Sequence, residues 1–167
     1  LGAEVVEFGR RALRNSVLGL SCSAEEPTDV RAPQSARSTN RMIAMIRSLG
    51  SSLWREGSGM LVAPGELSGP AKIDCGLAGT VMRFVPPLSM LVDGEVSFDG
   101  DAGARARPMK TTIESMQALG AEVTSGANSL PFTVIGKGAV TGGVLTIDAS
   151  ASSQFVSGLL LSAAKFN

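Results

Sequence analysis

The 167-residue sequence contains no histidine and no tyrosine, and aromatic residues make up only 4% of it. Without histidine, the chain cannot form a Ser-His-Asp triad, use a histidine general acid or hold a metal through imidazole. Lysine plus arginine and aspartate plus glutamate are equal, at 15 each, so no net charge attracts nucleic acid or an anionic membrane. No apolar run reaches the roughly 18 residues that a membrane-spanning helix requires. We therefore expect no nucleic-acid partner, no membrane partner and no metal.

Cysteine is nearly absent as well, with only Cys22 and Cys75, and no signal peptide is visible. Both observations favour a cytoplasmic protein, because unpaired cysteines are typical of a reducing compartment. The length and the 44% hydrophobic share suit one domain with a substantial core. The chain starts at Leu1 rather than Met and stops at Asn167, directly after a predicted helix. We interpret it as a fragment; a disordered or tag-derived N-terminus is the alternative.

One motif occurs twice, 74 positions apart, each time where a helix is predicted to start. Ile73–Thr80 recurs as Ile147–Gln154, and each copy leads from a short apolar run through small residues into an apolar segment. Small residues let a ligand approach the backbone, and a helix start presents unpaired N–H groups and the positive end of the dipole. The two starts therefore predict one pocket for phosphate or carboxylate groups.

The repeat extends to whole elements and predicts an α+β fold of duplicated subdomains. Each copy begins with a helix ended by Leu-Gly, at 40–50 and 110–120. Two strand-like runs follow each helix, at 52–54 and 60–62 in the first copy and at 122–124 and 132–135 in the second. A third strand then leads into the apolar helix, 79–91 or 152–164, and these two helices are expected to be the more buried. Residues 4–20 are drawn as an amphipathic helix.

Three segments, in this order, carry a family resemblance. Residues 74–84 resemble Gly-x-Ala-Gly-Thr-x-x-Arg, residues 100–109 resemble Gly-(Asp/Glu)…Arg-Pro-(Met/Ile), and residues 148–155 resemble Ser-Ser-Gln-Phe. These motifs are similar, in order and spacing, to those of the 3-phosphoshikimate 1-carboxyvinyltransferase (EPSP synthase) family. The resemblance implies repeated β-α-β-α-β-β units in an inside-out α/β barrel lobe, with buried helices and outward-facing sheets. It also implies that 38–167 form the N-terminal lobe of a two-lobed enzyme, with 1–37 a poorly matching segment.

The family's opening Pro-Gly-Ser-Lys-Ser string, followed by an arginine, has no counterpart in this chain. When Val17 and Leu18 are aligned with the family's first helix, Arg14 falls on the motif arginine, which implies binding of shikimate 3-phosphate. Phe8 and Gly9 then stand where the serine and lysine are expected. No residue inherits the lysine's role, so the catalytic residues are expected in missing segments.

The second copy of the motif is implied to bind shikimate 3-phosphate. The resemblance assigns the phosphate of that substrate to Ser152 and Ser153, and it assigns contacts with both substrates to Gln154. From the residues alone, the two serines could instead cap the helix, since small hydroxyl residues do this well. Both roles are compatible, because a cap and an anion site use the same geometry.

The resemblance assigns phosphoenolpyruvate to Gly79 and Thr80 of the first copy and to Arg107 of the 100–109 segment. From the residues alone, Gly79 and Thr80 could instead form a tight strand-to-helix turn. A guanidinium fork matches a carboxylate or phosphate, and Pro108 predicts an extended stretch at Arg107. Arg105 would then point to the opposite face, as a surface charge. Arg83 either bonds nearby carbonyls or binds a ligand.

Cys75 is expected to be a small residue that fills the turn and not a nucleophile. No basic neighbour adjoins it in sequence to lower the pKa of its thiol. The matching residue of the second copy is Ala149, which carries no reactive group. A role in packing accounts for both positions.

The resemblance implies transfer of the carboxyvinyl group of phosphoenolpyruvate to the 5-hydroxyl of shikimate 3-phosphate, a step of aromatic amino-acid biosynthesis that uses no cofactor. This chain would supply part of the pocket, and the missing C-terminal lobe would supply the rest. One alternative is UDP-N-acetylglucosamine carboxyvinyltransferase, which shares the repeats but is disfavoured by the Ser-Ser-Gln and Ala-Gly-Thr motifs. The other is a non-catalytic, anion-binding duplicate domain, which the missing lysine string keeps open.

Overall fold

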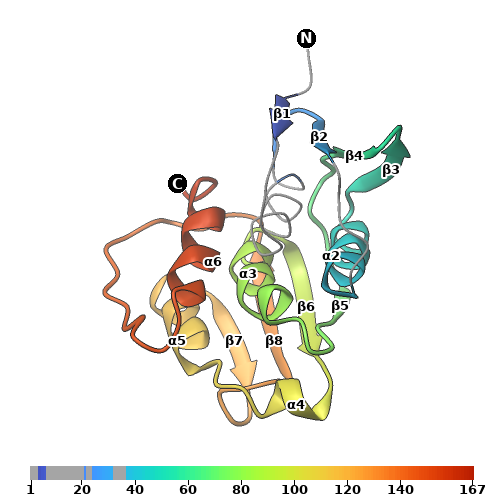
Figure 1. The fold of residues 1–167 in the computed structure, drawn as a ribbon. Helices are drawn as coiled ribbons and strands as arrows, with labels where there is room; N and C mark the ends of the chain where they lie inside the picture. Colours follow the sequence, from blue (N-terminus) through green and yellow to red (C-terminus); the bar gives the residue numbers. More distant parts are fainter. Residues whose placement is uncertain (1–3, 7–20, 22–23, 32–36) are drawn as a thin grey trace.

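The computed structural model describes residues 4–6, 21, 24–31 and 37–167. The described residues form two four-stranded sheets with helices packed against them (Figure 1). The first sheet contains β1 (Glu4–Val6), β2 (Thr28–Arg31), β3 (Ser52–Glu56) and β4 (Gly59–Ala63). The second contains β5 (Ala71–Asp74), β6 (Asp93–Asp99), β7 (Glu122–Ser125) and β8 (Phe132–Lys137). The helices are α2 (Arg37–Ser48), α3 (Gly79–Ser89), α4 (Ala102–Arg105), α5 (Lys110–Ala118) and α6 (Gln154–Ala163).

The two sheets have the same topology. Their strand orders are β1-β2-β4-β3 and β5-β6-β8-β7, and each combines one parallel pair with two antiparallel pairs. The second unit follows the order β5-α3-β6-α5-β7-β8, with the short α4 inserted before α5. The predicted duplication and the α+β class are therefore confirmed. Each repeated unit of the structure begins with a strand, β1 or β5. The copies proposed from the sequence began with a helix instead.

Each sheet buries one face and exposes the other. Along β5 the residues alternate between buried and exposed, as expected for a strand whose side chains point to opposite faces. On β6 and β8, the inward face carries Phe98 and Phe132, whose rings stack with centroids 5.0 Å apart. The helices cover these inner faces, which leaves the sheets facing outward.

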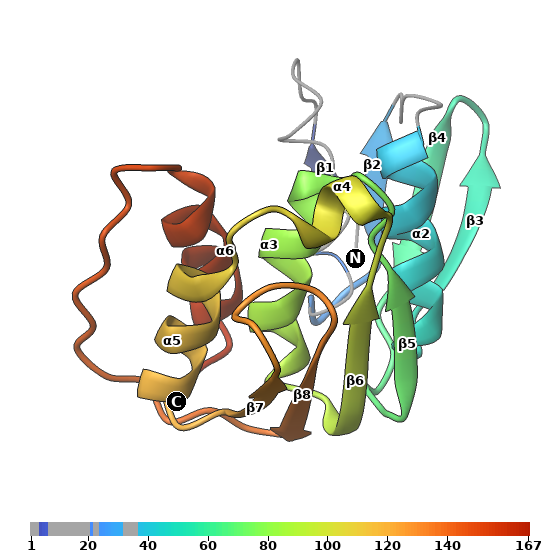
Figure 2. The ribbon, with the colours of Figure 1, turned by 90° about the horizontal axis from the view of Figure 1, so that it is seen from below.

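Helix α3 forms the centre of the core. It lies between α2 on one side and α5 and α6 on the other in both views (Figures 1 and 2). Its sequence is apolar nearly all round, and eight of its eleven residues are buried. Pro86 and Pro87 stand inside the helix, where proline cannot donate to the carbonyl four residues earlier. The predicted burial of this helix is confirmed.

Helix α6 is less buried than the sequence predicted. It packs against α3 along a face containing Phe155, Gly158 and Leu159, but Leu160 is 67% exposed. An apolar groove of about 420 Å³ separates this outer face from segment 142–147. Apolar composition had suggested burial all round, yet the described chain covers only one face of the helix.

Two other predicted elements differ in the structure. The prediction of a strand that leads into Ile147-Asp148 is wrong, because residues 139–149 contain no helix or strand. They form the long orange loop beside α6 (Figure 1). The equivalent strand β5 pairs in parallel with β6, whereas 144–148 have no partner strand among the described residues. A strand without a neighbour cannot pair its backbone groups. The helix drawn over 4–20 is wrong at Glu4–Val6, which pair as a strand with β2; residues 7–20 lie outside the described range.

The four other predicted helices and the four hairpin strands are present, with boundaries shifted by a few residues. Strands β1, β2 and β6 and helix α4 were not anticipated. Within the described part of the chain, no helix is both long enough and apolar enough to cross a membrane.

Candidate anion-binding site

The two repeats bring polar side chains together at the start of α3. A Cβ placed on Gly79 would lie 3.4 Å from Nη1 of Arg107, 3.5 Å from Nη1 of Arg83 and 3.7 Å from Oε1 of Gln154. Gly79 and Arg83 belong to α3, Gln154 begins α6, and Arg107 precedes α5. Three segments that are distant in sequence therefore surround the space that a glycine leaves open.

The motif repeats as local structure and not only as sequence. The N–H of Gly76 donates to Oδ1 of Asp74 at 2.8 Å, and 74 positions later the N–H of Ser150 donates to Oδ1 of Asp148 at 2.9 Å. In the same way, Ala78 donates to the carbonyl of Cys75 at 2.9 Å, and Ser152 donates to that of Ala149 at 3.1 Å. Aspartate side chains that accept from the backbone two residues on stabilise such turns. The predicted repeat is thus confirmed at both helix starts.

Arg107 is held beside the first of these turns. Its Nη1 donates to the carbonyl of Leu77 at 3.1 Å, just before α3 begins. Its backbone N–H donates to the carbonyl of Ala104 at 3.0 Å, which ends the single turn of α4. The extended stretch predicted at Arg107 does not reach back to Arg105, because Arg105 is the last residue of α4, whereas Arg107 lies outside the helix. A half-buried guanidinium with one backbone contact keeps donors for an anion.

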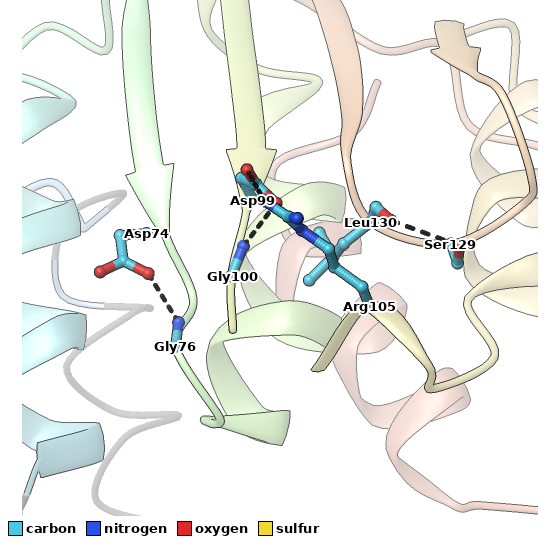
Figure 3. A network of polar contacts seen from close by, with 7 residues as sticks. All are labelled: Asp74, Gly76, Asp99, Gly100, Arg105, Ser129 and Leu130. Atoms are coloured by element: carbon cyan, nitrogen blue, oxygen red, sulfur yellow. Dashed lines mark hydrogen bonds and ion pairs between the residues drawn. The ribbon is translucent and has the colours of Figure 1, made fainter. Parts of the chain in front are cut away.

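Arg105 is a surface ion-pair residue. Its Nε and Nη2 donate to Oδ1 and Oδ2 of Asp99 at 2.8 and 2.7 Å, and Asp99 also accepts from the N–H of Gly100 at 2.8 Å (Figure 3). Hydrogen bonds from Arg105 and Gly100 lower the pKa of Asp99, and the same pairing raises the pKa of Arg105. Arg105 is thus a surface charge, as expected, but it pairs with the carboxylate of Asp99 and lies in a helix and not on an extended stretch.

Arg83 joins the two helices of the site. Its Nη1 donates to Oε1 of Gln154 at 2.7 Å, and its Cζ lies 5.1 Å from the ring centroid of Phe155. Burial, and secondarily the nearby charge of Arg107, lower the pKa of Arg83. The sequence had left open whether this arginine bonds carbonyls or binds a ligand; the structure places it on a side-chain amide. A lone charged residue on an apolar helix needs a polar partner, so the sequence indicated that Arg83 has one. It did not indicate that the partner is Gln154.

The serines of the second motif stand at the start of α6. Ser152 is half-buried, and its Oγ accepts a hydrogen bond from the N–H of Gln154 at 3.3 Å. Ser153 is exposed, and its carbonyl accepts from both the N–H and the Oγ of Ser157 at 3.0 Å. The N-cap residue of α6 is Ser153, and its side chain makes no cap hydrogen bond, so Ser152 satisfies the first N–H of the helix from the position before the cap. Thr80 is half-buried at the second position of α3, and Arg14 lies outside the described residues.

Asp74 and Cys75 hold the first turn together. Asp74 forms an ion pair with Arg41 of α2, and the hydrogen bonds from Arg41 and from the N–H of Gly76 lower its pKa. This ion pair was not anticipated, because nothing in the sequence places α2 against β5. Burial, followed by the charge of Asp74, raises the pKa of Cys75 to about 12. A thiol of this kind is not nucleophilic at neutral pH, which confirms its expected role in packing.

The site can bind and orient anions. Its groups are two guanidiniums, one amide and two helix starts. No cluster of three or more metal-ligating side chains occurs in the part of the chain that the structure describes. Fixed guanidinium and amide donors of this kind supply positioning and electrostatic stabilisation.

Comparison with solved structures defines the class of protein first. Two structures of EPSP synthase from Acinetobacter baumannii superpose on this chain with TM-scores of 0.82 and 23% identity. Each covers 99% of this chain, which corresponds to 39% and 40% of the solved chains. The fold is therefore that of part of an EPSP synthase.

The family follows from sequence. The family model for EPSP synthase (3-phosphoshikimate 1-carboxyvinyltransferase) matches residues 14–167, and the chain belongs to this family. A 3-phosphoshikimate 1-carboxyvinyltransferase from Kocuria rhizophila is 46% identical over 170 residues, covering 95% of this chain and 38% of the relative. The chain thus spans less than two fifths of the length of this curated relative.

Proposed function

We propose that this chain forms part of the substrate pocket of a 3-phosphoshikimate 1-carboxyvinyltransferase. The observation that carries the proposal is the convergence of Arg107, Arg83 and Gln154 on the space above Gly79. Such a constellation suits phosphoenolpyruvate, whose carboxylate and phosphate both accept hydrogen bonds from guanidinium groups. Membership of the EPSP synthase family supports the same reaction.

The proposed roles follow the two motifs. Arg107 clamps phosphoenolpyruvate, while Gly79 and Thr80 let it approach the start of α3. Ser152 and Ser153 bind the phosphate of shikimate 3-phosphate at the start of α6. Gln154 begins α6 and reaches toward Gly79 at the start of α3, from where it contacts both substrates. The geometry at Gly79 supports this division. Gln154 of the second repeat lies beside the same glycine as Arg83 and Arg107.

Arg14 is proposed to contribute to the shikimate 3-phosphate site as well. The family model begins its match at this residue. Arginine is suited to phosphate because its fork donates two parallel hydrogen bonds. Its position relative to Ser152 and Ser153 remains a prediction.

The proposed reaction joins two multiply charged anions. The 5-hydroxyl of shikimate 3-phosphate adds to C2 of phosphoenolpyruvate, and phosphate leaves from the resulting tetrahedral intermediate. Fixed cations and helix starts offset the repulsion between the substrates and hold the reacting atoms together. We propose that the groups for proton transfer lie in segments that this chain lacks, above all in the C-terminal lobe.

The wider assignment follows from the proposed activity. Residues 38–167 would belong to the N-terminal lobe, the C-terminal lobe would complete the pocket, and residues 1–37 would form the divergent segment. The groove beside α6 and the unpaired segment 144–148 support a continuation of the repeat. We propose a cytoplasmic location, which the free thiol of Cys75 supports.

The test is turnover by the full-length protein that contains this chain. Release of inorganic phosphate from phosphoenolpyruvate should require shikimate 3-phosphate, and the product should carry a carboxyvinyl ether at the 5-position. Turnover with UDP-N-acetylglucosamine in place of shikimate 3-phosphate would replace the proposal by the sister reaction. Binding of both anions without turnover would leave a non-catalytic role. The 167-residue chain alone should be inactive, because it supplies only part of the site.

A further inference from the structure

We infer that Arg41 of α2 is a positioning residue that holds the turn before α3 and, through the carbonyl of Leu77, directs Arg107 toward phosphoenolpyruvate. The inference rests on the proposed function and extends the site to a helix of the first unit. It starts from the contacts of Arg41 with Asp74 and Gly76, the residues that open this turn.

Arg41 contacts the turn through hydrogen bonds and through close packing. Its Nη1 donates to the backbone carbonyl of Asp74 at 3.1 Å and also to Oδ2 of the same residue. A Cβ on Gly76 would collide with Cζ, Nε and Nη2 of Arg41, so the guanidinium lies directly over this glycine. Gly76 has a φ of +51°, in the left-handed region that favours glycine. The glycine therefore serves both the shape of the turn and the position of the arginine.

The same turn carries the acceptor that holds Arg107. Oδ1 of Asp74 accepts from the N–H of Gly76 at 2.8 Å, so one carboxylate binds both Arg41 and the backbone of the turn. The carbonyl of the next residue, Leu77, accepts from Nη1 of Arg107 at 3.1 Å. The side chain of Leu77 is 54% exposed, so the turn and not side-chain packing has to fix this carbonyl. A shift of the turn would therefore move the guanidinium of Arg107.

Strand β5 lies at the edge of its sheet, so the turn after it needs support on the open side. On the side of β6, the N–H of Cys75 donates to the carbonyl of Asp99 at 2.8 Å. On the side away from β6, α2 packs against β5 (Figure 2), and Arg41 supplies the contacts with the turn. The side chain of Asp74 is 69% exposed, and an ion pair so open to water adds little to global stability. Its main effect is therefore expected on the geometry of the turn.

The second motif lacks a corresponding arginine among the described residues. When the repeated helices 40–50 and 110–120 are aligned, Thr111 stands in the place of Arg41. Thr111 and Asp148 line a pocket of about 250 Å³, so open space and not a guanidinium adjoins the second aspartate. The arginine contact is thus a feature of the turn that holds Arg107, as a role in directing Arg107 requires.

A double-mutant cycle in the full-length protein that contains this chain tests the inference. The variants are Arg41→Met, Arg107→Ala and the combination of both, with Arg41→Lys as the conservative replacement. Arg47→Met serves as the matched control, because Arg47 belongs to the same helix but donates to the carbonyl of Leu53 at 3.1 Å. KM for each substrate, kcat and thermal unfolding are measured for each protein.

Arg41→Met is expected to raise the KM for phosphoenolpyruvate about tenfold and to change that for shikimate 3-phosphate by less than about twofold. In the Arg107→Ala background the same substitution should change the KM for phosphoenolpyruvate by less than about twofold, because no guanidinium remains to be directed. Arg47→Met should leave both constants unchanged. Equal losses in both backgrounds would overturn the inference and make Arg41 act on the substrate directly. Equal losses for both substrates would also overturn it, in favour of a general structural role.

Arg41→Lys keeps the inference testable if Arg41→Met fails to fold. A lysine retains the charge, but its single ammonium cannot bond to Asp74 and also cover Gly76. The variant should therefore unfold like the wild type, and its KM for phosphoenolpyruvate should rise by roughly threefold. A KM equal to that of the wild type would overturn the inference while the proposed function stands. A wild-type protein that binds neither substrate would instead overturn the proposed function, and the inference with it.

Discussion

The backbone of Gly158 on α6 lies directly against the carbonyl oxygen of Arg83 on α3. Pro87 follows Arg83 by four positions and has no N–H to donate to that carbonyl, so the helix itself leaves the oxygen without its usual partner. Glycine exposes a Cα–H in the direction where any other residue has its Cβ, and such a hydrogen can approach a carbonyl closely. The interhelical distance that positions Gln154 beside Arg83 therefore depends on a proline and a glycine on opposite helices.

Gly158→Ala is expected to destabilise the protein by about 1–3 kcal/mol, the usual cost of forcing extra atoms into a packed interface. Because α6 must move away from α3, the variant should also weaken binding of both substrates. Gly126→Ala is the control, since an added Cβ there meets nothing within 4 Å. Chemical denaturation and substrate titrations check the prediction, and an unchanged unfolding midpoint in Gly158→Ala would contradict it.

Gly79→Ala should separate folding from binding. The added methyl would lie at ordinary contact distance, 3.4–3.7 Å, from Arg107, Arg83 and Gln154, so the fold should tolerate it. The methyl would occupy the space through which phosphoenolpyruvate reaches the start of α3, and its KM should rise on the order of tenfold or more. Steady-state kinetics beside thermal unfolding provide the measurement. Unchanged affinity in a folded variant would show that the substrate does not enter this space.

Arg107→Ala and the pair Ser152→Ala with Ser153→Ala should affect different substrates. Loss of Arg107 removes a charge-assisted contact worth about 1.5–3 kcal/mol, so the KM for phosphoenolpyruvate should rise roughly 10- to 150-fold, and far more than that for shikimate 3-phosphate. Loss of the two hydroxyls should weaken shikimate 3-phosphate, by less per residue, since the N–H groups at the start of α6 remain. Gln154→Ala should affect both substrates. The prediction fails if Arg107→Ala leaves phosphoenolpyruvate binding intact.

Asp74→Asn should make the protein less sensitive to acid. The pKa of Asp74 is lowered from its ordinary value of 3.8 by hydrogen bonds from Arg41 and Gly76, so folding favours the ionised form. The resulting stability is present above pH 3.8 and is lost as the pH falls through that value toward the lower folded pKa. The decrease in the unfolding midpoint between about pH 6 and pH 3 should therefore be smaller in Asp74→Asn than in the wild type. Glu122→Gln, at an exposed position of β7, is the control and should keep the full acid dependence.

Local chemistry made part of the site predictable. The turn before α3 and the turn before α6 each need an aspartate that accepts from the backbone and small residues after it, and both requirements are visible in the sequence. The apolar composition of α3 likewise indicated the helix that lies at the centre of the core. Arg107 was singled out because a guanidinium fork matches a carboxylate or phosphate and because the Arg-Pro-Met segment resembles the family motif.

Long-range pairing made the remainder unpredictable. Glu4–Val6 form a strand only because β2 lies beside them, while 144–148 form none because the described chain offers no neighbouring strand. The partner of Arg83 is 71 positions away, and only the packing of α6 on α3 brings it near. A motif can therefore identify a helix start, but the side chains that complete it depend on which elements pack together.

The rate at which the buried thiol of Cys75 is alkylated can report on opening of the turn before α3. Burial raises the pKa of Cys75 to about 12, so the thiol stays almost entirely protonated at pH 7. The Cys75 backbone is bonded on both sides, through its N–H to the carbonyl of Asp99 at 2.8 Å and through its carbonyl to the N–H of Ala78 at 2.9 Å. Alkylation of this thiol must therefore wait for the turn before α3 to open, so the labelling rate measures opening fluctuations of the turn. A ligand held at the start of α3 would slow labelling in proportion to its occupancy, which makes cysteine protection a way to follow binding without turnover.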